Sequence, residues 1–117
     1  MERFMLLLHE RPGVLGDVTP EEIGRIIARY QEWSDELAAK ERLAGGEKLV
    51  DEGGRHLRRE GGKVQVLDGP YTESKEVIGG YFLIQAASYE EAAAIAEGCP
   101  HLDYGWIEIR QIDPMQA

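Results

Sequence analysis

The hydrophobic pattern predicts a strand over residues 3–9 with two apolar faces. One face presents Phe4, Leu6 and Leu8, and the other presents Met5, Leu7 and His9. A strand that is apolar on both faces is typical of the centre of a sheet, where both sides are covered. We therefore expect this first strand to be central.

A helical period begins after Thr19. Thr19 is a suitable N-cap, Pro20 suits the first helical position, and Glu22 completes a capping box. Apolar residues then recur with helical spacing at positions 23, 26, 27, 30, 33, 37 and 44. The pattern predicts a helix to about residue 43, ended by the glycine pair at 45–46.

Short strands and one further helix are predicted for the rest of the chain. Strands are expected at residues 47–51, 55–59 and 63–68, with the glycine pairs at 53–54 and 61–62 as tight turns. A strand over residues 80–87 precedes a second helix, which Ser88 caps with Glu91 at the capping-box position. Pro100 helps to end that helix, and the final strand covers residues 104–112.

This order predicts an α+β fold, a ferredoxin-like β-α-β-β-α-β arrangement with an antiparallel sheet and one extra hairpin. Residues 1–113 would form a single domain, and residues 114–117 a tail.

Two helices can cover only one face of such a sheet. The last strand alternates in the same way, with aliphatic residues on one face and an aromatic, an acid and a base on the other: Ile107 and Ile109 against Trp106, Glu108 and Arg110. A single chain would leave a broad, partly apolar face in water. We therefore expect a homodimer whose sheets pack face to face around a cleft.

Composition narrows the classes of function. The chain has 117 residues, 43% of them hydrophobic, and a formal net charge of -9. This charge argues against nucleic-acid binding, and the basic cluster at residues 55–59 is interpreted as a solvated strand edge. The first apolar run is too short for a signal peptide or a membrane span, which favours a cytoplasmic protein. The single cysteine, Cys99, is expected to be a buried apolar group.

The segment DGPYTESKE at residues 68–76 gathers candidate chemistry between two predicted strands. One interpretation is an Asx-type turn in which Asp68 accepts backbone hydrogen bonds. The other places Asp68 and Tyr71 at a pocket rim, with Glu73 as a second carboxylate for acid/base work. Glu76 is interpreted as part of a solvated surface pair with its neighbour Lys75. The glycine pair at 79–80 indicates a bulge or a close backbone approach.

Two histidines, a tryptophan and an arginine are the remaining candidate site residues. His101 has a carboxylate nearby in sequence at Asp103 and is the candidate acid/base, whereas His9 is a candidate ligand-binding residue. Trp106 is a further candidate ligand-binding residue, and Arg110 could pair with an acid or bind a substrate carboxylate. No metal or nucleotide motif is present, so no cofactor is expected, although a metal site assembled in space stays open.

These segments together resemble the DGPF subgroup of the YCII-related domain family. The similarity rests on the opening FMLLL strand, DGPYTESKE at 68–76, GGYFLI at 79–84, the run Cys99-Pro100-His101 and the IEIR run at 107–110. Tyr71 stands where that subgroup usually has phenylalanine. The resemblance implies a dimeric α/β barrel made by two ferredoxin-like protomers, with a cleft between helices, sheet and partner chain.

The resemblance also bears on function. Members of the wider family are suspected of enzymatic activity because of a paired histidine and aspartate, but the first predicted helix here has no histidine. Two hypotheses follow. One is a small-molecule-binding protein, which as an enzyme would be a cofactor-free acid/base catalyst, with Asp68, Tyr71, Glu73, His101 and Arg110 lining the cleft. The other is a non-catalytic interaction module linked to transcription regulation, because family members often accompany sigma factors.

Overall fold

The computed structural model describes residues 1–68 and 76–115. The elements follow in the order β1 (Glu2–Glu10), α1 (Pro20–Ala39), β2 (Leu43–Lys48), β3 (Arg55–Glu60), β4 (Lys63–Asp68), β5 (Val77–Ala86), α2 (Tyr89–Ala96), the 3-10 helix η1 (Pro100–Asp103) and β6 (Trp106–Gln111). This is the predicted ferredoxin-like order with the extra hairpin β3–β4 inserted between β2 and β5.

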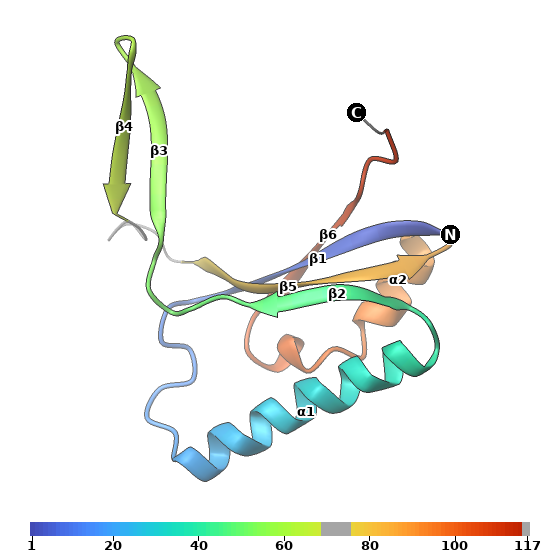
Figure 1. Cartoon of the computed structure of the whole chain (residues 1–117). Helices are drawn as coiled ribbons and strands as arrows, with labels where there is room; N and C mark the ends of the chain where they lie inside the picture. Colours follow the sequence, from blue (N-terminus) through green and yellow to red (C-terminus); the bar gives the residue numbers. More distant parts are fainter. Residues whose placement is uncertain (69–75, 116–117) are drawn as a thin grey trace.

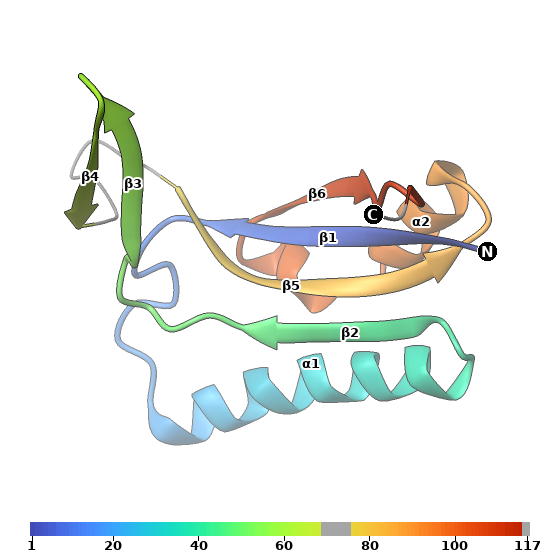
Figure 2. The ribbon, with the colours of Figure 1, turned by 45° about the horizontal axis from the view of Figure 1, so that its top comes forward.

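Four strands form one antiparallel sheet in the order β2-β5-β1-β6, with β1 in the centre as predicted. The hairpin β3–β4 makes a separate two-stranded sheet. Both helices lie on one side of the four-stranded sheet, and the hairpin rises on the other side (Figures 1 and 2). The second face of the main sheet, called here the open face, has no helix over it within the described residues (Figure 1).

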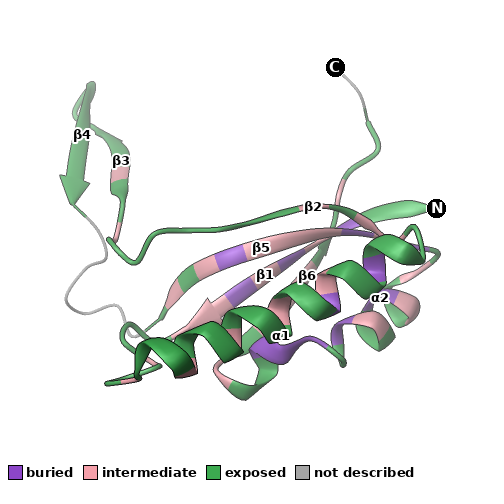
Figure 3. Ribbon diagram, turned by 60° about the horizontal axis from the view of Figure 1, so that its bottom comes forward, coloured by how far each residue is buried: buried purple, intermediate pink, exposed green. Residues whose placement is uncertain are grey.

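The hydrophobic core lies between the sheet and the two helices. Phe4, Leu6 and Leu8 point into it from β1, as the alternation predicts, and Ile84 joins them from β5. Trp33 and Leu37 cover them from α1, and the rest of the core is small: Ala86, Ala92, Ala96 and Cys99. Buried residues follow the helix-covered side of the sheet, whereas the hairpin is almost entirely exposed (Figure 3).

Both predicted N-caps are present. The Thr19 hydroxyl accepts from the backbone N–H of Glu22 at 3.1 Å, and the Ser88 hydroxyl accepts from that of Glu91 at 3.2 Å. These bonds satisfy amide groups that an α-helix leaves without partners at its start. The capping residues therefore fix where each helix begins relative to the sheet.

The predicted end of α1 is wrong by four residues. The helix stops at Ala39 in a Schellman arrangement, in which Arg42 N–H bonds to the Leu37 carbonyl at 2.8 Å and Glu41 N–H to the Ala38 carbonyl at 3.0 Å. Glu41 takes the left-handed conformation, with φ 58°, that glycine usually occupies. The helix therefore ends without a glycine at the left-handed position, so the sequence pattern does not reveal where it ends.

The glycine pair at 45–46 belongs to β2, where a strand over 47–51 was predicted instead. A Cβ on Gly46 would stand 2.9 Å from both the Tyr81 carbonyl oxygen and the Phe82 ring, so the close approach of β5 requires glycine. The glycine pair at 79–80 behaves as the sequence predicts. The register between β1 and β5 shifts at Gly79, opposite the step from Leu8 to His9, which confirms the predicted bulge.

No helix in residues 1–68 or 76–115 combines the length and apolar composition that crossing a membrane requires.

Candidate functional site

The open face gathers the aromatic and ionisable residues at one end of the central strands. His9 on β1 is paired in register with Trp106 on β6, and Leu7 with Glu108. Directly opposed residues of antiparallel strands point to the same face, so these side chains lie together there. The predicted shared face of Trp106, Glu108 and Arg110 is confirmed, and it is the face that His9 also occupies.

His9 is held on two sides. Its Nε2 lies 3.0 Å from Glu108 Oε1, and its ring stacks on the Trp106 indole with centroids 4.0 Å apart and planes within 7°. Because a carboxylate only accepts, Nε2 carries a hydrogen and donates it. In the neutral ring Nδ1 is then the nitrogen with a free lone pair. The His9 side chain retains 16% of its exposure.

Nδ1 of His9 has no hydrogen-bond partner among the described residues. No fully buried side-chain nitrogen or oxygen of the described chain lacks a partner. Nδ1 therefore has accessible surface. Glu108 itself is 34% exposed and also lies 3.6 Å from the Arg110 guanidinium.

His101 has a different environment from the one predicted. It is 2% exposed, its Nε2 donates to the His9 carbonyl oxygen at 2.8 Å, and its Nδ1 lies 3.0 Å from the Tyr30 hydroxyl. Both ring nitrogens are therefore engaged. Asp103, its expected partner, instead binds Arg29 at 3.0 Å. The geometry makes His101 a brace that fixes the backbone of His9, and its role as an acid/base stays a prediction.

Burial raises the pKa of two ionisable groups near His101, the Tyr30 hydroxyl and the Cys99 thiol. It raises the pKa of the Tyr30 hydroxyl well above its ordinary value, with smaller contributions from Cys99 and Glu10, so this phenol stays protonated and donates to His101. Burial also raises the pKa of the Cys99 thiol, which is 3% exposed. The prediction that Cys99 is a small buried apolar group is confirmed.

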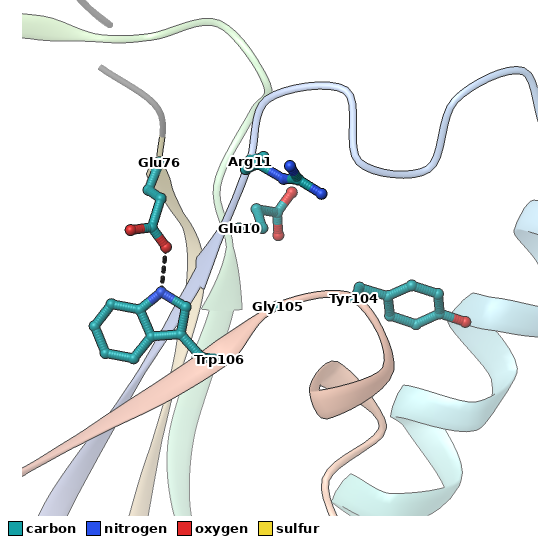
Figure 4. A pocket seen from close by; sticks show the side chains of 6 residues that line it. All are labelled: Glu10, Arg11, Glu76, Tyr104, Gly105 and Trp106. Carbon is teal, nitrogen blue, oxygen red and sulfur yellow. Dashed lines mark hydrogen bonds between the residues drawn. The ribbon is translucent and has the colours of Figure 1, made fainter. Parts of the chain in front are cut away.

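A cavity of about 340 Å³ adjoins the open face at the end of β1. Glu10, Arg11, Glu76, Tyr104, Gly105 and Trp106 line it. The Trp106 indole N–H donates to the Glu76 carboxylate (Figure 4). Glu10 lies at the end of β1 and Arg11 just after it, and the Tyr104 ring points towards α1. Trp106 is thus shared between the cavity and the stack with His9.

Asp68 is not brought to this place. Asp68 lies at the end of β4 on the hairpin, with a side chain that is 89% exposed and 3.3 Å from Arg55. Tyr71 and Glu73 lie outside the described residues. The proposed lining of Asp68, Tyr71, Glu73, His101 and Arg110 is therefore not observed as one set.

Sequence reasoning missed three acids. Glu108 was assigned to the right face but not to His9, because their pairing depends on strand register. Glu76 was interpreted as a solvated surface pair with Lys75; Glu76 is exposed and its carboxylate accepts from the Trp106 indole, whereas Lys75 lies outside the described residues. Glu10 was not considered, although it immediately follows His9. Among the described residues, no group of three or more His, Cys, Asp and Glu side chains is placed to hold a metal ion.

The fold and this face define an α+β domain of ferredoxin-like topology with an acid–histidine pair on its uncovered sheet. The sequence matches the YCII-related domain over residues 2–116, so the chain belongs to the YCII-related domain family. No curated protein matches it.

Solved structures share the fold. One is the 5-chloro-2-hydroxyhydroquinone dehydrochlorinase of Burkholderia phenoliruptrix AC1100, in complex with 2,5-dihydroxybenzoquinone. The similarity has a TM-score of 0.56 at 17% sequence identity and covers 95% of this chain and 93% of that one. At this identity the likeness establishes the common fold.

Proposed function

We propose that this protein binds a small planar organic acid on its open face and exchanges a proton with it through Nδ1 of His9. The observation that carries the proposal is the 3.0 Å contact between His9 Nε2 and Glu108, which leaves Nδ1 as the accessible nitrogen. Imidazole is the side chain best suited to proton transfer near neutral pH. Glu108 fixes the tautomer and stabilises the ring when it becomes charged.

The aromatic stack selects the class of ligand. Trp106 is 45% exposed, so part of its ring is available to a flat molecule beside His9. Such stacking is favourable for aromatic partners. Arg110 is exposed on the same face, and Arg11 lines the adjoining cavity, where either guanidinium could bind an acidic oxygen. The quinone bound to the dehydrochlorinase of the same fold supports a hydroxylated ring as the probe.

A second copy of the chain would complete the cleft. The open face carries Met5 and Leu7 from β1 and Leu83 from β5, all half-buried, around the polar end at His9. Packing this face against its counterpart would remove apolar surface from water and enclose the proton-transfer residues. A desolvated site strengthens the interaction of His9 with Glu108.

The alternative of a regulatory interaction module rests on the family resemblance alone. The two hypotheses differ in whether ionisable groups converge at a cleft. Glu10, Arg11 and Glu76 do converge on the cavity beside Trp106, and His9 and Glu108 are paired next to it. This convergence favours the small-molecule function.

Titration calorimetry with 2,5-dihydroxybenzoquinone tests the proposal. We expect His9→Gln to weaken binding at least about tenfold and Glu108→Gln to weaken it less, with a changed pH profile. His56→Gln, a histidine change on the hairpin, is the matched control and should leave affinity unaltered. Equal affinity of the parent protein and His9→Gln would refute the role of His9.

A further inference from the structure

The hairpin β3–β4 is poorly supported by its own chain. In the part of the chain that the structure describes, it shares no strand pairing with the main sheet. Leu57 pairs with Val66 and Arg59 with Val64, so one hairpin face, called here the arm face, presents Leu57, Val64 and Val66. These three residues are 64%, 49% and 61% exposed. A two-stranded hairpin alone is marginally stable in water, which indicates that another surface covers the arm face.

The dimensions of the chain show how much surface is left uncovered. Its radius of gyration is 16.4 Å, whereas a compact domain of this length has about 13 Å. Its accessible surface is 8316 Å², against about 6,400 Å² for a compact monomer of this mass. The excess of roughly 1,900 Å² exceeds the roughly 800 Å² that each partner buries in a standard stable interface.

The charge of the hairpin favours a second copy of this chain as the partner. Arg55, Arg58, Arg59 and Lys63 are balanced only by Glu60 and Asp68, which gives residues 55–68 a net charge of +2. Since the whole chain has -9, the remaining residues carry -11. A basic arm on an acidic body is complementary to the body of an identical molecule.

The position of the hairpin agrees with this partner. It rises on the open-face side of the sheet, from the end where β5 begins and where His9 and Trp106 lie (Figures 1 and 2). A copy seated on the open face would therefore meet the arm. Glu76, just before β5, binds the Trp106 indole through its carboxylate, at the same end of the sheet.

We propose that the β3–β4 hairpin is an arm that docks its Leu57–Val64–Val66 face on a second copy of this chain and thereby completes the site around His9. This inference rests on the proposed function, in which the second copy encloses the open face. It assigns a partner to the hairpin and makes the ligand site dependent on that contact.

Sedimentation equilibrium of the full chain tests the arm. Val66→Asp places a charge in the arm face, and Gln65→Asp places the same charge on the other face of β4, as the matched control. We expect Val66→Asp to raise the dissociation constant of the dimer at least about tenfold and Gln65→Asp to change it less than about threefold. Because Val66 is exposed in the single chain, far-UV circular dichroism should be unchanged. Leu57→Asp repeats the test from β3.

The possible outcomes distinguish docking of the arm from face-to-face packing of the open faces. If Val66→Asp and Leu57→Asp both form dimers with the dissociation constant of the parent protein, the arm is overturned. The open-face dimer is then unaffected. A parent protein that is monomeric at micromolar concentration overturns both the arm and the open-face dimer. A dissociated Val66→Asp that binds 2,5-dihydroxybenzoquinone as tightly as the parent overturns the link between the arm and the His9 site.

Discussion

Gly105 offers the sharpest test of how His9 is positioned. The residue joins η1 to β6, and its N–H donates to the His101 carbonyl at 2.9 Å. A Cβ at this position would overlap the His9 carbonyl oxygen and stand 3.0 Å from His101 Nε2. Gly105→Ala therefore forces apart the two groups whose hydrogen bond, 2.8 Å long, fixes the end of β1.

The expected loss of stability in Gly105→Ala follows from the broken hydrogen bond and from overpacking. Leaving the buried His101 nitrogen without its partner costs about 1–3 kcal/mol, and overpacking adds about 1–3 kcal/mol. We expect the free energy of unfolding to fall by about 2–6 kcal/mol. For a domain of this length about 1 kcal/mol corresponds to roughly 4 °C, so the melting temperature should fall by about 8–24 °C.

Urea unfolding at fixed protein concentration measures the change, because any dimer would make stability depend on concentration. Gly24→Ala is the matched control: it lies within α1 and a Cβ there would meet nothing within 4 Å. This control should stabilise the protein by about 0.5–1 kcal/mol through helix propensity. A loss below about 1 kcal/mol for Gly105→Ala would refute the brace between His101 and His9.

Two further predictions concern the helix end and alkaline pH. Glu41→Gly should raise the free energy of unfolding by about 0.5–1 kcal/mol, because glycine adopts the left-handed conformation at the end of α1 without strain; a lower urea midpoint would contradict this. Folding raises the pKa of both Cys99 and Tyr30, so their stabilisation is complete below the unfolded pKa values and declines as pH rises through the folded ones. The urea midpoint should therefore fall from about pH 8.5 upward, and Cys99→Ala should flatten the first part of that fall, whereas an unchanged slope would contradict the role of the thiol.

The period of the hydrophobic pattern and the helix-capping residues were sufficient to predict most of the fold. The alternation around Phe4 and Leu6 placed the central strand and its core face, and Thr19 and Ser88 located both helix starts. These signals are local, since they depend on residues at most a few positions apart. The end of α1 was missed because its left-handed residue is Glu41, which no propensity rule favours.

The candidate site depends on contacts that a sequence does not display. Alternation placed His9 on one face of β1 and Glu108 on one face of β6, but their pairing requires the register between those strands. His101 seemed the better acid/base because Asp103 is close in sequence. Folding instead buries it between Tyr30 and the backbone of His9. Proximity along the chain was a poor guide to proximity in space.

The central claim is that His9, with Nδ1 open and Nε2 bound to Glu108, is the histidine that meets the ligand. Nitrogen-15 spectra of the three histidine rings during a titration with 2,5-dihydroxybenzoquinone test this within one sample. We predict that the His9 Nδ1 signal moves on binding while the His56 and His101 signals stay in place. Movement of the His101 signals alone, or no movement at His9 under saturation, would contradict the account.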